Sequence, residues 1–337
     1  MSNYLKNKNV LITGADGFIG SHLTEKLAEY DCNIKAMTMY NSFNNWGWLE
    51  NINPSILKNI QVVSGDIRDA KFVNESCKKI DYVFHLASLI AIPYSYYSPS
   101  SYLETNSHGT LNILESCLNN SIERLIHTST SEVYGETKKV PINENTQLIA
   151  RSPYSATKIA ADQLAYSYYS SFGLPVSIIR PFNTYGPRQS SRAIIPTIIT
   201  QLLKNKNIRL GSLYPTRDFS YIDDTVNGFI KISQSKNSLG EVINIGSGYE
   251  ISIGDLFIII REILGSHAKI LKDKARIRPR EGEVFRLKAD NKKAKELIKW
   301  SPKYSGKQGL VKGLNETINW FSQEDNLKLY KSNLYNI

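Results

Sequence analysis

A glycine-rich segment near the N-terminus, TGADGFIG at positions 13–20, constrains the fold of this chain more than any other feature. It follows an apolar run at 9–13 that predicts a strand, and it leads into an amphipathic pattern at 18–30 that predicts a helix. Glycines at such a junction allow a tight turn whose backbone N–H groups meet a pyrophosphate at the helix N-terminus. The context therefore predicts a dinucleotide site; the alternative is a strand–helix turn that binds nothing.

Strand-like runs alternate with helical stretches along the first half of the chain, which is typical of a parallel sheet flanked by helices. Strands are expected at 9–13, 34–39, 60–64, 82–87, 124–129, 176–180 and 242–245, and helices at 18–30, 106–117 and 154–171. We therefore predict an α/β fold, a Rossmann-type doubly wound parallel sheet with a smaller, discontinuous α/β substrate-binding lobe. The dinucleotide-binding domain is expected at 1–183 with a returning segment near 226–249, the lobe at 184–225 and 250–321 with an irregular structure, and a C-terminal tail at 322–337.

Composition limits the class of protein. Of 337 residues, 41% are hydrophobic and 21% charged, which is ordinary for a globular chain and excludes a disordered one. No apolar run approaches the length of a membrane span, and the first one is too short for a signal peptide, so we expect a cytoplasmic protein that contacts no membrane. Three cysteines without a CxxC pair argue against a disulfide framework and against a thiolate metal site.

The formal net charge of +10 is regional, because residues 267–312 hold 15 Lys and Arg against 5 Asp and Glu. A basic region favours an anionic partner, which can be nucleic acid, an anionic membrane or a phosphorylated small molecule. The motifs below favour the small molecule, so we expect no binding to nucleic acid.

The segment after the second expected strand lacks the acidic residue that a dinucleotide site usually places on the adenosine ribose. Tyr40, Asn41 and Ser42 stand there, and no Asp or Glu lies between Asp31 and Glu50. No arginine is present to receive a 2′-phosphate either, so the sequence favours NAD slightly and leaves NADP open. After the third strand, Asp66 and Ile67 are expected near the adenine; the alternative for Asp66 is a helix cap.

Tyr154 and Lys158 lie four residues apart and so share one face of an expected helix. A nearby ammonium stabilises a phenolate, which lowers the pKa of the tyrosine and helps it to take a proton from an alcohol. The spacing alone is common; together with the glycine loop and a Ser/Thr-rich strand end upstream it indicates catalysis.

These motifs, in order, resemble the extended short-chain dehydrogenase/reductases, the nucleotide-sugar epimerase/dehydratase family, across nearly the whole chain. The resemblance is carried by TGADGFIG at 13–20, HLAS at 85–88, Asn106, TSTSEVYG at 128–135, the Tyr154/Lys158 pair, RPFNTYGPR at 180–188, RDFSYIDD at 217–224 and Arg278-Pro279. It implies a cofactor site made of Gly14, Asp16, Gly17, Phe18, Ile19, Tyr40, Asn41, Ser42, Asp66, Ile67, Leu86, Ala87, Ser88, Asn106, Thr128, Tyr154 and Lys158. It also implies a homodimer formed through a four-helix bundle that includes the helices of Asn106 and Tyr154.

Within that family, the sequence Thr130-Ser131-Glu132 resembles the 4,6-dehydratases, since plain 4-epimerases usually lack a carboxylate at this position. Once C4 of the sugar is a ketone, a base must remove the C5 proton and an acid must protonate the departing C6 hydroxyl, and one glutamate can serve both steps. We therefore expect Thr130, Ser131, Glu132, Tyr154 and Lys158 to be catalytic. UDP-glucuronate decarboxylases also carry this triplet, a 4-epimerase is a further alternative, and a dinucleotide-binding sensor is the non-enzyme alternative.

The resemblance implies a nucleotide-sugar substrate, gripped by guanidinium groups that suit phosphate oxygens. The expected substrate-binding residues are Ser129, Asn183, Arg188, Arg192, Arg217 and Arg278, whereas Arg276 and Arg280 are expected on a solvated face. The segments at 40–50 and 278–291 are similar to dehydratases of bacterial legionaminic-acid-type pathways, which act on GDP- or UDP-N-acetylglucosamine. Trp46 and Trp48 are expected to plug the adenine side.

Overall fold

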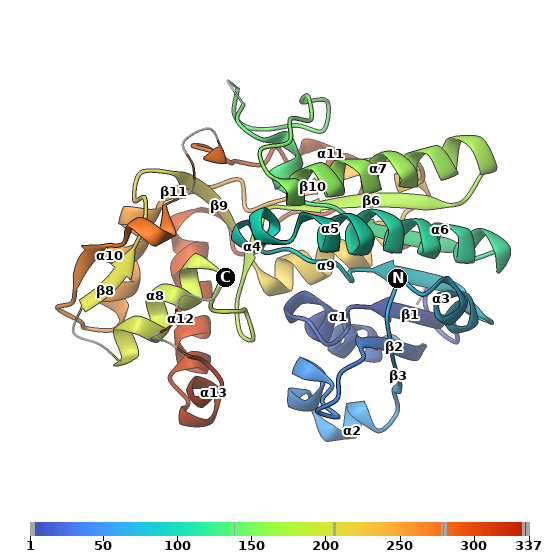
Figure 1. Ribbon diagram of the computed structural model, residues 1–337, viewed down its shortest axis with the longest axis horizontal. Helices are drawn as coiled ribbons and strands as arrows, with labels where there is room; N and C mark the ends of the chain where they lie inside the picture. Colours follow the sequence, from blue (N-terminus) through green and yellow to red (C-terminus); the bar gives the residue numbers. More distant parts are fainter. Residues whose placement is uncertain are drawn as a thin grey trace.

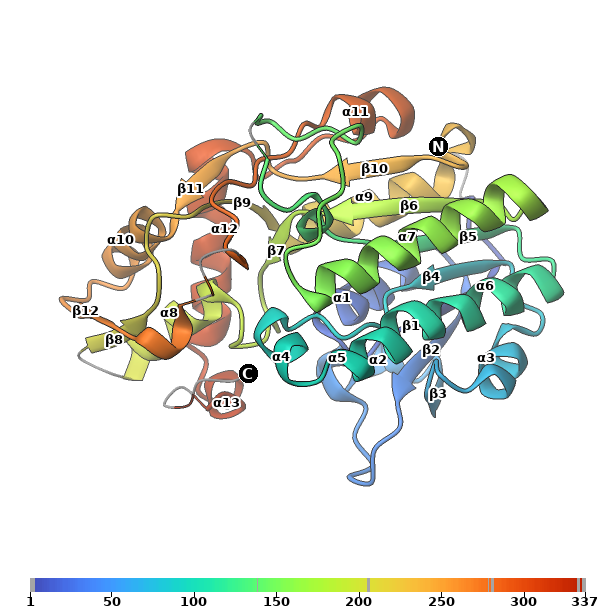
Figure 2. The same ribbon diagram turned by 45° about the horizontal axis from the view of Figure 1, so that its top comes forward.

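Seven parallel strands form the central sheet, in the order β3–β2–β1–β4–β5–β6–β10 (Figure 2). The structure, a computed structural model, describes residues 4–137, 139–204, 207–277, 279, 282–331 and 334. The strands are β1 (Asn9–Thr13), β2 (Asn33–Met39), β3 (Gln61–Gly65), β4 (Tyr82–His85), β5 (Arg124–Thr128), β6 (Val176–Pro181) and β10 (Val242–Ile245). The order reverses between β1 and β4, where an open α/β sheet forms a crevice at the carboxyl ends of its strands.

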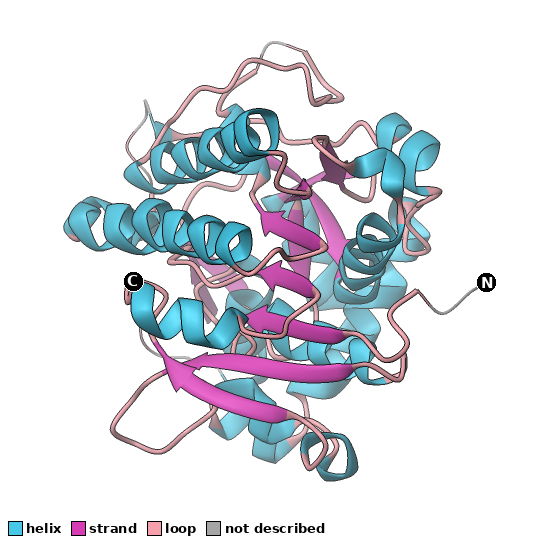
Figure 3. Cartoon of the chain, turned by 90° about the vertical axis from the view of Figure 1, so that its right-hand side faces the viewer, coloured by secondary structure: helices cyan, strands magenta, loops and turns pink. Residues whose placement is uncertain are grey.

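Helices cover both faces of this sheet (Figure 3). One face carries α3 (Ala70–Cys77), α6 (Gly109–Asn119) and α7 (Pro153–Phe172), and the other carries α1 (Phe18–Ala28) and α9 (Ile222–Gln234). In β1, Val10 and Ile12 pack into one core while Leu11 packs into the other. A strand buried on both faces must be apolar throughout, which explains the continuous apolar runs in the sequence.

A smaller lobe lies beside the carboxyl ends of the sheet strands (Figure 1). Its strands form two small sheets, β11–β9–β7 and β12–β8, from β7 (Asn183–Tyr185), β8 (Asn207–Leu210), β9 (Thr216–Tyr221), β11 (Glu250–Ser252) and β12 (Lys269–Lys272). Its main helices are α8 (Ile194–Lys204), α10 (Ile253–Ile263) and α12 (Gly306–Phe321). The chain leaves the sheet after β6, re-enters it through α9 and β10, and returns to the lobe with β11, so the two parts are interleaved.

Short helices complete the structure. They are η1 (Gly47–Asn51), α2 (Pro54–Leu57), α4 (Ile92–Tyr97), α5 (Pro99–Tyr102), the π-helical η2 (Leu103–His108), η3 (Ser131–Tyr134), η4 (Lys236–Ser238), η5 (Lys274–Arg276), α11 (Lys292–Ile298) and α13 (Glu324–Lys328). In the part of the chain that the structure describes, every helix is too short or too polar to cross a bilayer.

The predicted fold class is confirmed, and the seven expected strands all lie in the main sheet. The helix expected at 106–117 is present, but residues 103–108 are π-helical and the α-helix begins at Gly109. One expectation was wrong. The lobe is not irregular: it is built around α8, α10 and α12, and four of its five strands have only three or four residues, too few to show a period in the sequence.

An aromatic cluster joins the two parts of the molecule. Trp48, just inside η1, stacks on Tyr330 with ring centroids 6.0 Å apart and meets Trp320 of α12 edge-on at 5.8 Å. The Tyr330 hydroxyl donates to the carbonyl oxygen of Gln189 at 3.0 Å. The C-terminal segment is thereby packed against both the sheet domain and the lobe.

Candidate active site

A cavity of about 850 Å³ lies between the carboxyl ends of the sheet strands and the lobe. Its walls come from the glycine loop, the ends of β2 to β6, the start of α7 and the lobe segments 183–197 and 210–219. The cavity therefore lies at the reversal point of the sheet, where the topology predicts a ligand site.

The glycine loop forms one wall and leaves no room for side chains. Gly14 has a φ of +70°, and a Cβ there would lie 2.8 Å from the backbone nitrogen of Ala87. A Cβ on Gly20 would lie 2.1 Å from the carbonyl oxygen of Gly14. Gly17 is the N-cap of α1 and supplies no side-chain acceptor, so the first N–H groups of the helix lack a side-chain cap. Such a loop fits the pyrophosphate of a dinucleotide.

The end of β2 differs from the expectation. Tyr40, Asn41 and Ser42 do not line the cavity; Tyr40 is 68% exposed, and the Asn41 side chain closes its own loop by accepting from the backbone of Phe43 at 3.0 Å. The wall is made instead by Met39 and by two residues that the sequence did not distinguish from core, Met37 and Thr38.

Two residues close this side of the cavity. Asp16 in the glycine loop accepts from the backbone N–H of Met39 at 3.2 Å, and burial raises the pKa of its carboxyl. The carbonyl oxygen of Asp16 accepts from the N–H of Trp48 at 3.0 Å. Trp48 lines the cavity, whereas Trp46 does not.

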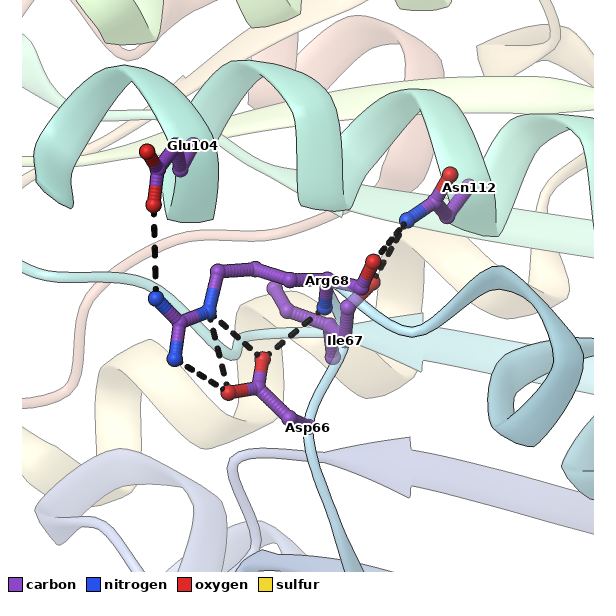
Figure 4. A network of polar contacts seen from close by, with 5 residues as sticks. All are labelled: Asp66, Ile67, Arg68, Glu104 and Asn112. Atoms are coloured by element: carbon purple, nitrogen blue, oxygen red, sulfur yellow. Dashed lines mark hydrogen bonds and ion pairs between the residues drawn. The ribbon is translucent and has the colours of Figure 1, made fainter. Parts of the chain in front are cut away.

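Asp66 and Ile67 line the cavity after β3, and Figure 4 shows the polar contacts that hold this turn. Arg68 binds the Asp66 carboxylate through Nη2 at 2.6 Å and reaches Glu104 at 3.4 Å, and hydrogen bonding to Arg68 lowers the pKa of Asp66. Asn112 holds this turn by donating to the carbonyl oxygens of Ile67 and Arg68, both at 3.0 Å. The helix-cap alternative for Asp66 was wrong, because Asp69 is the N-cap of α3.

The segment after β4 is fixed by buried hydroxyl and amide groups. The Thr13 hydroxyl accepts from the backbone N–H groups of Leu86 and Ala87, both at 3.1 Å, so these residues and Ser88 form the floor of the cavity. Asn106 was expected in the cofactor site, but it is 1% exposed and does not line the cavity. Its amide accepts from the N–H of Leu89 at 2.8 Å and donates to the carbonyl oxygen of Leu89 at 2.9 Å.

The structure brings Thr130, Tyr154 and Lys158 together at the end of β5. Helix α7 begins with a Ser152/Ser155 capping box, which orients its first turn toward the strand end. Tyr154 and Lys158 both line the cavity, and Lys158 Nζ donates to the carbonyl oxygen of Thr128 at 2.5 Å. The Thr130 hydroxyl, which accepts from the backbone N–H of Glu132 at 3.2 Å, is hydrogen-bonded to Tyr154.

The electrostatics of the pair differ from the expectation. Burial is the largest influence on the pKa of Tyr154 and raises it well above its usual value, with a smaller contribution from the charge of Glu132. Burial lowers the pKa of Lys158 to about 8. Lys158 is not among the leading influences on the pKa of Tyr154, and its Nζ is directed to the carbonyl oxygen of Thr128.

Ser129, Ser131 and Glu132 also line the cavity, on the turn from β5 into η3. Ser131 is buried and Glu132 half-buried. Thr130 caps η3, so the short helix sets the direction in which Glu132 leaves the backbone. A carboxylate thus shares one wall with the hydroxyl groups of Thr130 and Tyr154.

The arginines expected at the substrate are distributed unevenly. Arg188 and Arg217 are buried and line the cavity, but each already has an acidic partner, Glu25 for Arg188 and Glu283, at 3.4 Å, for Arg217. Arg192 is exposed at the rim and donates to the Ser190 hydroxyl at 3.2 Å. Arg278 lies outside the described residues.

Four polar groups of the lining have no hydrogen-bond partner among the described residues. They are Nδ2 of Asn183, Nη1 of Arg188, Oε1 of Gln189 and Oγ1 of Thr128. Buried polar atoms in proteins are almost always paired. These atoms fit a polar ligand that would supply the missing partners.

Sequence reasoning missed Glu283 and misplaced Arg276. Arg276 lines the cavity, half-buried, and donates to Asp273 at 3.1 Å, so it does not belong to a solvated face. Glu283 is 8% exposed and lines the same wall. The only sequence signal for Glu283 was its position in the segment at 278–291, whose resemblance to dehydratases was noted above. A single charged residue does not show whether its side chain lies in a site or on the surface.

The chain is similar in sequence to a known protein family. The sequence model of the family described as GDP-mannose 4,6 dehydratase matches residues 11–312. The chain is 33% identical to a putative UDP-glucose 4-epimerase from Methanocaldococcus jannaschii, over 94% of this chain and 99% of that protein.

Two solved structures are similar as well. A UDP-N-acetylglucosamine 4-epimerase from Methanobrevibacter ruminantium, in complex with UDP-N-acetylmuramic acid, has a TM-score of 0.83 at 32% identity, over 94% of this chain and 98% of that chain. A dTDP-glucose 4,6-dehydratase from Streptomyces venezuelae, with NAD bound, has a TM-score of 0.81 at 27% identity, over 94% and 97%.

Proposed function

The chain belongs to the GDP-mannose 4,6 dehydratase family of nucleotide-sugar dehydratases and epimerases, and on this premise we propose that it is an NAD-dependent nucleotide-sugar 4,6-dehydratase. The observation that carries the choice of reaction is the carboxylate of Glu132 on the same cavity wall as Tyr154 and Thr130. A 4-epimerase needs no base at C5, whereas a dehydratase does.

The cofactor is NAD, which the glycine loop, the floor at Leu86 and Ala87, and the turn at Asp66 fit. Bound there, NAD would supply the acceptor for the C4 hydride and the source of the hydride that the sugar later regains. The guanidinium of Arg68 lies near this turn, but Asp66 and Glu104 already pair with it, and this pairing favours NAD over a cofactor with a 2′-phosphate.

Tyr154, Thr130 and Lys158 act at C4. The Tyr154 phenolate takes the proton of the C4 hydroxyl, and the Thr130 hydroxyl holds the C4 oxygen. Since burial raises the tyrosine pKa, the protonated Lys158 must stabilise the phenolate once the ligands are in place.

Glu132 acts at C5 and C6. Its carboxylate removes the C5 proton, which the C4 ketone has made acidic, and gives that proton to the C6 hydroxyl as it leaves as water. C5 regains a proton, which balances the one that Tyr154 removed from the C4 oxygen. The net change is the loss of one water.

We propose GDP- or UDP-N-acetylglucosamine as the substrate. The test is incubation of the purified protein with each nucleotide sugar, followed by mass spectrometry and chromatography. Loss of the mass of one water from either compound is the expected result, and it also identifies the carrier nucleotide.

A 4-epimerase is the second candidate, because similar proteins carry that name. A 4-epimer of unchanged mass would overturn the dehydratase assignment. Loss of carbon dioxide from UDP-glucuronate, with both N-acetylglucosamine compounds unchanged, would replace it with a decarboxylase.

We also propose a homodimer through α6 and α7. Apolar side chains are exposed on α7, with Tyr166 51% and Phe172 59% exposed, and on η2, which leads into α6, with Leu103 58% exposed. Such exposure over neighbouring helices is typical of an interface. Light scattering coupled to size exclusion should give twice the chain mass, and Tyr166→Lys should reduce it to one chain.

A further inference from the structure

We propose that Asp162 is the positioning residue of this site: its buried carboxylate keeps Lys158 aligned on the sheet and charged. The inference rests on the proposed function for its catalytic meaning, but the placement of Asp162 concerns this chain alone. Asp162 lies one helical turn beyond Lys158, as Lys158 lies one turn beyond Tyr154, so the three residues form one buried stripe of α7.

Two successive residues at the end of β5 hold this stripe. Thr128 accepts from Lys158 Nζ at 2.5 Å, and the Ser129 hydroxyl donates to Asp162 Oδ2 at 2.7 Å. Lys158 and Asp162 are therefore attached to adjacent positions of one strand. Any rotation of α7 that displaced Asp162 would also displace the ammonium.

Asp162 is also the partner of a buried arginine. Arg180 on β6 donates to Asp162 Oδ2 from Nε at 3.1 Å and from Nη2 at 2.8 Å, and the two side chains are 3% and 1% exposed. Arg180 Nη1 donates to the Tyr134 hydroxyl at 2.9 Å, which donates to Asn244 at 2.7 Å. The carboxylate is thus fixed from two strands and from η3.

The histidines near the stripe add no fixed charge close to Lys158. His127 Nε2 lies 3.3 Å from Asp162 Oδ1, and burial lowers the pKa of both His127 and His85, which keeps them neutral at pH 7. The groups that interact with Lys158 or Asp162 are His85 on β4, His127 on β5, Arg180 on β6 and Tyr154 on α7. Two carboxylates lie further out: Glu132 on η3 acts on Tyr154, and Glu144 lines a small cavity with Asp162 and Arg180. The phenols of Tyr102 on α5 and Tyr134 on η3 adjoin Tyr154 and Arg180.

The fully buried charges around the stripe are therefore Lys158, Asp162 and Arg180, and the Asp162 carboxylate interacts with both cations, whereas Glu132 and Glu144 are only partly buried. Without its negative charge, two cations would share a site of low polarity, and the lysine, the one that can lose its proton, would do so at lower pH. The charge of Asp162 already acts against this loss. If Asp162 only held α7 in place, removal of its charge would not change the pH at which Lys158 loses its proton.

The test is a titration of the Lys158 side chain by NMR in the full chain labelled at lysine, with the signal assigned by its disappearance in Lys158→Arg. In Asp162→Asn, which keeps the size and acceptor of the side chain, the midpoint is expected to fall by about one pH unit or more. Tyr134→Phe is the matched control, because it breaks the same network without changing a charge, and its midpoint should equal that of the wild type.

A second variant keeps the proposal falsifiable if Asp162→Asn does not fold. Arg180→Gln leaves the carboxylate without its guanidinium, so the midpoint should move to higher pH. Equal midpoints in wild type and in either charge variant, or a shift of the same size in Tyr134→Phe, would overturn the proposal.

The catalytic consequence is measured separately. With an active substrate, the alkaline limb of the kcat–pH profile should move to lower pH in Asp162→Asn while KM stays within about twofold. If no nucleotide sugar reacts, the proposed function fails, yet the NMR midpoints still decide the role of Asp162.

Discussion

Burial of Tyr154 opposes the reaction that we propose for it, because a phenolate forms less readily in an apolar site. The same burial leaves Lys158 with a pKa of about 8, near the range in which it must stay protonated. The pair therefore depends on its surroundings: the hydroxyl of Thr130 on one side and the carboxylate of Asp162 on the other. The two side chains depend on these neighbours because they are buried, and their spacing in the sequence alone does not reveal this.

At this scale we predict that Glu132→Gln abolishes dehydration while C4 oxidation continues. An amide cannot remove the C5 proton, so kcat should fall by about 10²–10⁴. Reduced nicotinamide should build up, measured by its absorbance, while mass spectrometry shows no loss of water. Glu123→Gln, which alters only a surface pair with Lys8, should behave like the wild type. Normal water loss in Glu132→Gln would remove the basis for the dehydratase.

Single residues were predicted unevenly from the sequence. The glycine loop and the Tyr154/Lys158 pair were placed in the cavity wall because local spacing determines their direction. Tyr40, Asn41 and Ser42 were not, because the strand end turns outward and Asn41 binds its own loop. Ion-pair partners such as Glu25 and Glu283 are distant in sequence, so no local pattern could show that Arg188 and Arg217 are paired.

At the scale of elements, the β1–α1 junction can be tested with one pair of glycines. Gly14 and Gly173 both have φ near +70°, so alanine at either position meets similar backbone strain. Gly14→Ala also meets the backbone of Ala87, whereas a Cβ on Gly173 has nothing within 4 Å. We expect Gly14→Ala to weaken NAD binding at least about tenfold and Gly173→Ala to leave it unchanged, as measured by calorimetry. Equal affinities in both would contradict the assigned loop.

Helix α1 contacts the lobe through His22, whose ring nitrogens lie 3.0 Å from the Pro187 carbonyl oxygen and 3.4 Å from Arg188. Burial, with a smaller effect of Arg188, lowers the His22 pKa from 6.5 to about 3. The unfolded chain therefore binds a proton that the folded chain does not, and stability is lost as pH falls from 6.5 toward 3.

In His22→Gln, the free energy of unfolding should fall less steeply on acidification, by about 1.4 kcal/mol per pH unit, as measured by urea unfolding between pH 7 and pH 4. Burial of His85 and His127 also lowers the free energy of unfolding as pH falls, and both histidines are present in the wild type and in the variant. The exposed His267→Gln is the control and should follow the wild-type slope. A slope that His22→Gln leaves unchanged would refute this account.

Elements with strong local signals were predicted well. The main-sheet strands contain short apolar runs, and α7 has a serine cap before it and glycine after it, so both signals are local. The π turn before α6 was not foreseen, because Asn106 reaches Leu89 only in the folded chain. The small sheets of the lobe were missed for a similar reason, since partners such as β12 and β8 are about sixty residues apart.

For the whole molecule, the cluster of Trp48, Trp320 and Tyr330 should set how firmly the lobe is held. Tyr330 is 6% exposed, so Tyr330→Ala should lower the free energy of unfolding by about 3 kcal/mol and also weaken NAD binding, because Trp48 lines the cavity. Tyr4→Ala, at a tyrosine 41% exposed, should change neither quantity. Stability and NAD affinity, measured by denaturation and calorimetry, should fall together; a loss of stability alone would mean that the cluster does not shape the cavity.

The overall fold, a doubly wound sheet with a lobe beside its strand ends, could be predicted from the alternation of strand and helix patterns and from the point where that alternation stops. The closing contact could not be predicted, because Trp48 and Tyr330 stand at opposite ends of the chain and an isolated aromatic has no preferred partner. The basic region was also interpreted too broadly, since Arg276 lines the cavity rather than the surface.

The interleaved path of the chain has a consequence for how such an enzyme can change over time. Because β10 completes the main sheet after the chain has already visited the lobe, no single crossover in the gene could exchange one substrate lobe for another. A new lobe would need two inserted segments that fit each other as well as the sheet. New substrates would therefore be acquired by point substitutions around the existing cavity rather than by shuffling modules.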